Sequence, residues 1–333
     1  MVTIKDVARE ANVAISTVSN VLNHVDNVSD STKQRVLEAV ERLKYVPNSN
    51  ARALKSGKKK VIGLFLPSVQ GDFYRCLIQA IHVQCKKYGY ILNISISNEN
   101  TSEEIYGLII AAGVSGAIIM NNHFENDYIH QLKLLDIPVV FMDRVYTDIN
   151  ISSVTVDNYS GAVMAVEYLV QLGHKRIGFF HGLRDHGDEV ERYRGYCDVM
   201  KKYGYALDTA FEYDGMYVEE AAYRKMCEQT AAGNVLPDAI FCANDEMAWG
   251  CIRGLLDAGV KVPEQVSVIG FDDNSLNVIF QPPLTTVHTD TEKLGRDSVE
   301  ELIRLIETEG HTQGTNQKME SGLVIRETCS AKV

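Results

Sequence analysis

Several familiar signatures are missing from the 333-residue sequence. No apolar run approaches the roughly eighteen residues that a membrane-spanning helix needs, and no signal-peptide pattern is present. The seven cysteines are odd in number and scattered, without a Cys-x-x-Cys pair, which favours buried, reduced thiols over disulfides or metal sites. We therefore expect a cytoplasmic protein that binds no metal.

Signatures of enzyme active sites are missing as well. The sequence contains no Gly-x-Ser-x-Gly motif, no P-loop and no strand-linked Gly-x-Gly-x-x-Gly motif. Its histidines are scattered without the spacing of metal ligands. These absences argue against catalysis, and we expect no cofactor.

Positive charge is scarce overall and concentrated at one end. The net charge is −11, but residues 1–60 hold 11 Lys or Arg and 6 Asp or Glu, a net of +5. The rest of the chain holds 22 and 38, a net of −16. A basic head on an acidic body places the attraction for phosphate groups at the N-terminal end.

Residues 3–23 predict two short helices with a tight turn between them. The apolar stripe of the first helix has the spacing i, i+3, i+4 and i+7 and consists of Ile4, Val7, Ala8 and Ala11. Thr3 is a suitable N-cap, and Asp6 lies three residues later, close to a capping box. Asn12 follows the stripe and tolerates the left-handed conformation that a turn needs.

The second predicted helix, which begins near Ala14, has an unusual outer face. Its buried stripe of Val18, Val21 and Leu22 leaves an outward set of Ile15, Ser16, Ser19 and Asn20, with Thr17 near the boundary. Exposed helix faces are usually charged, and this face carries no charge. Short hydroxyls and amides can reach base edges and phosphates, and an aliphatic side chain can contact a thymine methyl. On periodicity alone, a helical hairpin that packs internally fits equally well.

A third predicted helix favours the DNA-binding interpretation. It begins at Ser29 and Asp30, and ends before Val46-Pro47. Its predicted core face consists of Val36, Leu37, Val40 and Leu43. Three short helices with the middle one facing a groove form a small helix-turn-helix domain.

From Val61 onward, apolar strand-like runs alternate with helical patterns. This repeated βα pattern predicts buried parallel strands. A second set begins near Ser160, so we expect two similar α/β lobes in tandem. Ligands bind at the carboxyl ends of parallel strands, so we expect a cleft between the lobes.

Motifs along almost the full length of the chain resemble the lactose repressor (LacI/GalR) family of bacterial transcription regulators. In the head they are Ile4-Lys5-Asp6-Val7-Ala8, Ser16-Thr17-Val18-Ser19, Val21-Leu22-Asn23 and Tyr45-Val46-Pro47-Asn48. In the body they include Asp157-Asn158, Arg192-Tyr193-Arg194-Gly195-Tyr196, Asn244-Asp245-Glu246-Met247-Ala248 and Ser267-Val268-Ile269-Gly270-Phe271-Asp272-Asp273. Each is weak alone, but their order and spacing are specific.

The resemblance implies three regions. Residues 1–46 would be the helix-turn-helix domain, residues 47–60 a hinge helix and linker, and residues 61–333 a periplasmic-binding-protein-like core. In such cores the chain crosses between the lobes three times. The first lobe would then span about 61–157 and 288–318, and the second about 158–287 and 319–333.

The resemblance also implies which residues contact DNA. These are Thr3, Lys5, Ile15, Ser16, Thr17, Ser19, Asn20, Asn23, Ala51, Leu54 and Lys55. In the family, paired hinge helices enter the minor groove and a leucine wedges a base step open, a role that falls to Leu54. Without the resemblance, residues 47–60 fit a flexible basic linker equally well.

Family positions for a small effector map onto residues after strand ends in both lobes. They are Phe73, Tyr74, Asn121, Asp143, Arg192, Tyr217, Asn244 and Asp272. Carboxylates, amides and a guanidinium suit vicinal hydroxyls, and an aromatic face suits the apolar side of a sugar. Structural alternatives exist, because Asn244 and Asp272 could cap helices, Arg192 could form a surface ion pair, and Phe73 and Tyr217 could pack in the core.

Three departures from the family pattern affect the expected function. Asn20 stands where most members have Arg, Ala14 replaces the usual Ser cap, and Trp249 replaces a small aliphatic residue, where it could underlie or line the cleft. No leucine heptads follow the last predicted strand, near 323–326, so we expect a homodimer.

Together these features predict a repressor of sugar or carbon-source genes, located in the bacterial cytoplasm at the nucleoid. It would bind a pseudo-palindromic operator and a small effector, a sugar or sugar derivative. The alternative is a cytoplasmic sugar-binding or sugar-hydrolysing α/β protein, with Asp143 and Asp272 as an acid–base pair.

Overall fold

The computed structural model describes residues 3–22, 28–44, 60–97, 99–121, 123–308, 310 and 312–332. The chain forms two compact units, Met1–Lys59 and Lys60–Val333. No helix in the described parts of the chain is long and apolar enough to cross a bilayer. Asn23, Ala51, Leu54 and Lys55, all predicted to contact DNA, lie outside the described residues.

The first unit contains three helices: α1 (Ile4–Glu10), α2 (Ile15–Leu22) and α3 (Asp30–Arg42). They pack around a small apolar core centred on Val7, Val18 and Val36, each fully buried. One core prediction is wrong, because Leu37 is 51% exposed and Ala39 is buried instead. Position 39 follows Val36 by three residues and so shares its helix face, whereas position 37 is turned about 100° away.

Two local predictions for the first unit are confirmed. The Asp6 carboxylate accepts hydrogen bonds from the Thr3 backbone N–H and hydroxyl, at 2.9 and 2.7 Å, at the start of α1. Asn12 has a φ of 51° and so adopts the left-handed conformation in the turn before α2.

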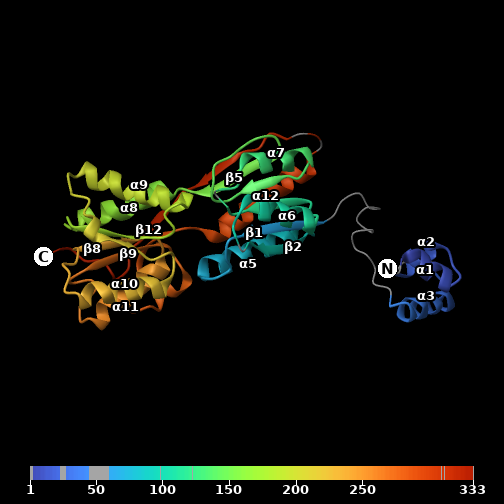
Figure 1. The fold of residues 1–333 in the computed structure, drawn as a ribbon, viewed down its shortest axis with the longest axis horizontal. Coiled ribbons are helices and arrows are strands. Elements are labelled where there is room, and N and C mark those ends of the chain that lie inside the picture. Colours follow the sequence, from blue (N-terminus) through green and yellow to red (C-terminus); the bar gives the residue numbers. More distant parts are fainter. Residues whose placement is uncertain are drawn as a thin grey trace. The chain divides into compact units, whose positions relative to one another are not determined.

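The second unit contains two six-stranded sheets (Figure 1). The order in the first is β11 (Asn316–Met319), β5 (Ile151–Val156), β4 (Val139–Phe141), β3 (Gly116–Ile119), β1 (Val61–Leu66) and β2 (Ile91–Ile96). The order in the second is β12 (Gly322–Val324), β10 (Thr285–His288), β9 (Ser267–Asp272), β8 (Ala239–Cys242), β6 (Ile177–His181) and β7 (Glu212–Asp214). Neighbouring strands are parallel, except that β12 pairs with β10 antiparallel.

Helices cover both faces of each sheet. The first lobe has α5 (Asp72–Lys87), α6 (Ser102–Ala112), α7 (Asn126–Leu134) and α12 (Thr291–Glu307). Two cores lie on its opposite faces, one with α5 and α12 and the other with α6 and α7, because side chains alternate along each strand. The second lobe has α8 (Asn158–Gln171), α9 (Gly187–Lys202), α10 (Glu219–Ala231) and α11 (Asp245–Asp257).

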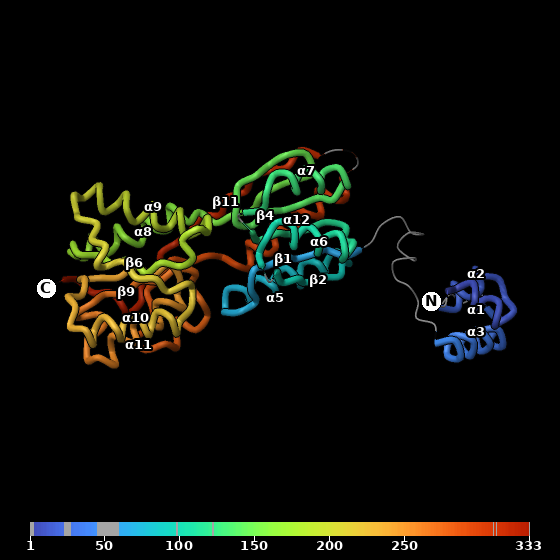
Figure 2. The backbone as a smooth tube through the Cα atoms, in the orientation of Figure 1, coloured from blue at the N-terminus to red at the C-terminus, as the bar shows by residue number. Residues whose placement is uncertain are grey.

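The path of the chain between the lobes agrees with prediction. Helix α12 packs against α5 and the first sheet, and β12 returns to the second sheet. Figure 2 shows this late, orange-to-red part of the chain running through both lobes. Two 3₁₀ turns, η1 (Thr209–Phe211) and η2 (Ser275–Val278), complete the described elements of the second lobe. One boundary prediction is wrong, since α9 begins at Gly187 rather than near 191.

Candidate functional site

A cavity of about 320 Å³ lies between the lobes, at the carboxyl ends of their strands. All eight residues predicted as effector contacts line it: Phe73, Tyr74, Asn121, Asp143, Arg192, Tyr217, Asn244 and Asp272. The two lobes contribute four residues each. The βα alternation predicted the cleft, and the family resemblance supplied these eight positions; their proximity does not assign them a ligand.

Arg192 anchors the second-lobe side and is buried rather than part of a surface ion pair, with 6% of its area exposed. Its Nε donates to the Asn158 amide oxygen at 2.9 Å, and Nη1 donates to the backbone carbonyl of Ala243. Its Nη2 lies 3.4 Å from Asp272 Oδ1, and the guanidinium carbon lies 3.8 Å from the Phe271 ring centroid. Stacking and hydrogen bonds together fix the guanidinium plane.

Asp272 is the last residue of β9 and is held in a strained conformation, with a φ of 108°. Burial raises the pKa of its carboxyl to about 7, opposed by the adjacent Arg192 and reinforced by the charge of Asp188. Tyr217, also at positive φ (62°), donates its hydroxyl to Asp188 at 2.8 Å. Two strained positions beside one cavity are typical of a ligand site.

On the first-lobe side, Asp143 follows β4. Its Oδ1 is buried and finds no hydrogen-bond partner among the described residues. Burial raises the pKa of this carboxyl to about 8, and the charge of Asp188 acts in the same direction. Phe73 and Tyr74 form an edge-to-face pair, with centroids 5.5 Å apart, and also pack on the first-lobe core. Together they give the cavity an aromatic wall beside an unsatisfied acceptor.

Two of the predicted contacts have structural partners of their own. Asn121 donates its amide to Asn100 and accepts the His123 N–H at 2.9 Å. Asn244 accepts the Met247 N–H at 3.0 Å and so caps α11, the alternative considered from the sequence. Both amides hold loops at the cavity edge in place.

Several lining residues, including Asp188, Thr289 and Glu246, were not predicted from the sequence. Asp188 lies one helical turn before Arg192, within 4.0 Å, so an earlier start for α9 would have placed both on one face. Thr289 is 4% exposed and its hydroxyl finds no hydrogen-bond partner among the described residues. No sequence pattern marks this threonine.

Direct contacts join the lobes beside the cavity. The Ser275 N–H at η2 donates to Asp72 Oδ2 at 2.7 Å, at the start of α5. His123 Nε2 of the first lobe lies 3.4 Å from Asp185 Oδ2 of the second. These contacts stabilise the present angle between the lobes.

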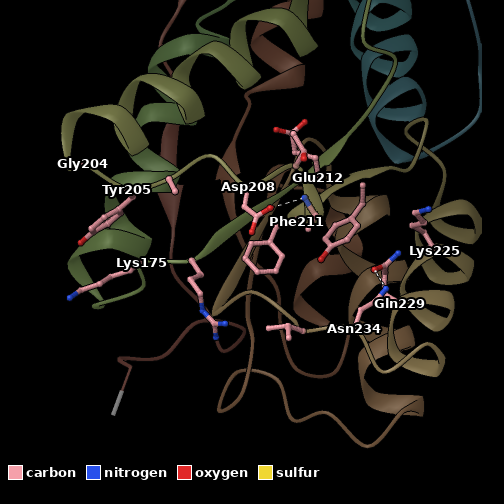
Figure 3. Close-up of a pocket in the computed structure, with 15 residues that line it drawn as sticks. Lys175, Gly204, Tyr205, Asp208, Phe211, Glu212, Lys225, Gln229 and Asn234 are labelled. Atoms are coloured by element: carbon pink, nitrogen blue, oxygen red, sulfur yellow. Dashed lines mark hydrogen bonds between the residues drawn. The ribbon is translucent and has the colours of Figure 1, made fainter.

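A second hollow, of about 920 Å³, lies at the amino ends of β6 and β7 in the second lobe. Lys225, Gln229 and Asn234 lie on one side of Phe211, with Lys175 and Tyr205 on the other (Figure 3). Within its lining, the Asn234 amide donates to the Gln229 side-chain oxygen at 2.8 Å. This open hollow gathers residues from one lobe only, so it cannot couple ligand binding to lobe movement.

In the head, α2 presents the predicted outer face. Ile15 is 40% exposed and Ser16 is exposed, while Thr17, Ser19 and Asn20 are half-buried. Thr3 and Lys5, at the start of α1, are exposed as well. The face remains uncharged and accessible, as a groove-reading helix requires.

Comparisons with known proteins find matches to both the N-terminal head and the two-lobed core. Residues 3–48 match the family described as bacterial regulatory proteins, lacI family, and residues 166–329 match a periplasmic binding protein-like domain. Catabolite control protein A of Priestia megaterium is 35% identical over 289 residues, 86% of this chain and 87% of that protein. The transcriptional repressor PurR of Pasteurella multocida is 31% identical, over 100% of both chains.

Solved structures are also similar. A lac repressor dimer bound to operator and the anti-inducer ONPF matches with a TM-score of 0.77 and 29% identity, over 99% of both chains. The regulator CelR in complex with cellobiose matches with a TM-score of 0.72 and 28% identity, over 98% of this chain and 100% of that one. The chain therefore belongs to the lacI family of bacterial regulatory proteins and is a DNA-binding transcription regulator, not an enzyme.

Proposed function

We propose that the protein is a ligand-responsive repressor that binds a pseudo-palindromic operator as a homodimer and controls genes of sugar or other carbon-source metabolism. The observation that carries the proposal is the cavity of about 320 Å³ to which both lobes supply polar side chains. Its acceptors and aromatic wall suit a hydroxylated ring. The similarity to a regulator solved with cellobiose supports the same ligand class.

On DNA, α2 lies in the major groove, where the side chains from Ile15 to Asn20 meet base edges. Lys5 contacts phosphates, because its ammonium group is exposed beside that face. The hinge contacts of Ala51, Leu54 and Lys55 rest on the family resemblance. The protein acts in the bacterial cytoplasm, at the nucleoid.

Ligand binding changes the angle between the lobes. The contacts between Asp72 and Ser275 and between His123 and Asp185 must shift when that angle changes. The angle sets the separation of the two linkers in a dimer, and hence the stability of the paired hinge helices on DNA. Coupling between two such sites is typically about 1–3 kcal/mol.

Exposed apolar side chains indicate where the two subunits meet. In the first lobe they are Val83, Ile91, Ile94 and Ile96, and in the second Leu276, Val278 and Ile279. Strand β2 is an edge strand, and an exposed apolar edge invites association. The Asp72–Ser275 contact places η2 beside α5, so both groups flank one helix.

The test is operator affinity of the full chain with and without each member of a carbohydrate panel. We expect at least one member to change the affinity by roughly 5- to 150-fold. If no carbohydrate changes either operator affinity or thermal stability, the proposed ligand class is wrong, while membership of the family stands.

A further inference from the structure

Acidic side chains outnumber basic ones in the cleft lining. Its lining includes four carboxyl groups, those of Asp143, Asp188, Glu246 and Asp272, but Arg192 is the only Arg or Lys among the described lining residues. His186 is the one other titratable nitrogen in this set. An anionic ligand that enters this cavity therefore finds few basic groups to bind.

The single guanidinium is already engaged by the protein. Each of its three nitrogens donates to a protein oxygen, on Asn158, Ala243 or Asp272. Asp188 lies 4.0 Å away and adds a second carboxylate. Part of its hydrogen-bonding capacity is thus used before any ligand arrives, and the described lining offers no other Lys or Arg to an anion.

The electrostatic environment disfavours additional negative charge. Burial raises the pKa of both Asp143 and Asp272, to about 8 and about 7, which means that the cavity resists the charged form of its own carboxyls. A ligand phosphate would experience the same desolvation and the same repulsion.

Two unsatisfied acceptors indicate what the cavity does accommodate. Asp143 Oδ1, in the first lobe, and Thr289 Oγ1, in a segment between the lobes, are buried without partners among the described residues. Thr289 is held in place by its backbone N–H, which donates to the Asp272 carbonyl at 3.2 Å. Ligand hydroxyls would give both oxygens the partners that buried polar atoms require.

We propose that the effector is a hydroxyl-rich molecule without phosphate or carboxylate, and that Asp143 and Thr289 determine this specificity by bonding its hydroxyls. The inference rests on the proposed function and narrows its ligand class. The proposed effector class includes free sugars and polyols and excludes their phosphorylated derivatives and their oxidised derivatives that carry a carboxylate.

The first experiment uses matched pairs with the full chain. Glucose is compared with glucose 6-phosphate and glucuronate, galactose with galactose 6-phosphate, and ribose with ribose 5-phosphate, by thermal shift and then by calorimetry. We expect a neutral member to bind and its anionic counterpart to bind at least a hundredfold more weakly. Equal or tighter binding of an anionic member overturns the inference but leaves the proposed sugar response standing. Failure of all members overturns the sugar proposal itself.

The second experiment tests the two residues with the neutral sugar that binds. Thr289→Val keeps the shape and removes the hydroxyl, and should weaken binding at least tenfold. Thr312→Val is the matched control, because the Thr312 hydroxyl is also buried and unpartnered but lies outside the cavity lining. Above pH 8, where Asp143 is ionised, Asp143→Asn should reduce the ratio of the affinity for the neutral member to that for its anionic counterpart at least fivefold. Wild-type affinity in Thr289→Val, or an unchanged preference in Asp143→Asn, removes that residue from the assignment.

Discussion

The head and the core use polar side chains in opposite ways. Among its described residues the head buries only apolar groups, and it presents small uncharged side chains outward from α2. The core buries the polar side chains that line its cavity: Arg192, Asp272 and Thr289 are at most 8% exposed. Substitutions on the head face should therefore alter recognition at little cost to stability, whereas substitutions in the cleft alter binding and stability together.

The largest expected effect is on dimerisation, because tight operator binding requires two linked heads. Ile91→Glu combined with Ile279→Glu should convert the dimer to monomers, because each side chain is 69% exposed in the single subunit and becomes buried in the proposed interface. Operator affinity should fall by roughly a hundredfold or more, since two linked heads bind with avidity. Sedimentation and operator titration measure both effects.

Val235→Glu is the matched control, because Val235 is equally exposed, at 69%, but lies beside the second hollow. A double variant that remains dimeric would place the interface elsewhere.

The next effect tests the separation of head and core directly. Arg192→Ala and Asp272→Ala should bind operator with near wild-type affinity and no longer respond to the cognate ligand. Each loses charged hydrogen bonds worth about 1.5–3 kcal/mol, so ligand affinity should fall roughly tenfold or more. Operator affinity is measured with and without ligand.

Circular dichroism must accompany these measurements, because removal of Arg192 leaves the buried carboxylate of Asp272 without its charged partner. If both folded variants respond at wild-type ligand concentrations, the cavity is not the effector site.

A third prediction distinguishes insertion of the hinge leucine into bent DNA from charged contacts to phosphates in the DNA-binding region. Leu54→Ala should weaken specific operator binding roughly tenfold and leave the head folded, because a wedge acts only on bent DNA. Lys5→Ala and Lys55→Ala should lower affinity for all sequences and reduce the salt dependence by about one unit each. Titrations on operator and random DNA at several salt concentrations distinguish the two patterns. Wild-type operator binding by Leu54→Ala would exclude hinge insertion.

A fourth prediction concerns base choice. Asn20 should favour adenine, whose N6 and N7 match its amide, whereas Arg at this position would favour guanine. Asn20→Arg should therefore shift one position of each half-site towards guanine, by about 1 kcal/mol or more. Selection from random DNA measures the shift, and an unchanged base at every position contradicts it.

The smallest effect is on stability, and it is confined to the core. Burial raises the pKa of Asp143 from 3.8 to about 8, so the folded protein holds this proton more tightly than the unfolded chain. The stability associated with that proton is fully present below about pH 4 and is lost as the pH rises towards 8. Asp143→Asn has no carboxyl to ionise, so it should avoid part of this loss of folding stability, on the order of 1 kcal/mol at pH 8.

Thermal melts from pH 5 to pH 8 test this last prediction. The melting temperature of Asp143→Asn should rise relative to that of the wild type as the pH increases. If the two proteins' melting temperatures change in parallel with pH, Asp143 does not contribute.

Local rules predicted the elements better than their boundaries. Apolar runs identified most strands, but β10 (Thr-Thr-Val-His) and β11 (Asn-Gln-Lys-Met) were missed, because neither contains an apolar run; β11 depends on pairing with β5. The cleft was predicted because strand ends must converge. Asp188 was missed because the start of α9 was placed four residues late, and Thr289 because its importance arises only from burial without a partner.

Trp249 is the only tryptophan in the sequence and lies beneath the cleft rather than in its lining. Its indole N–H donates to Asn277 Oδ1 at 2.9 Å, and Asn277 belongs to η2, whose Ser275 contacts α5 of the other lobe. The one tryptophan is therefore hydrogen-bonded to a residue that lies two positions from an interlobe contact. Its emission should report the lobe angle in real time, without any label and without DNA.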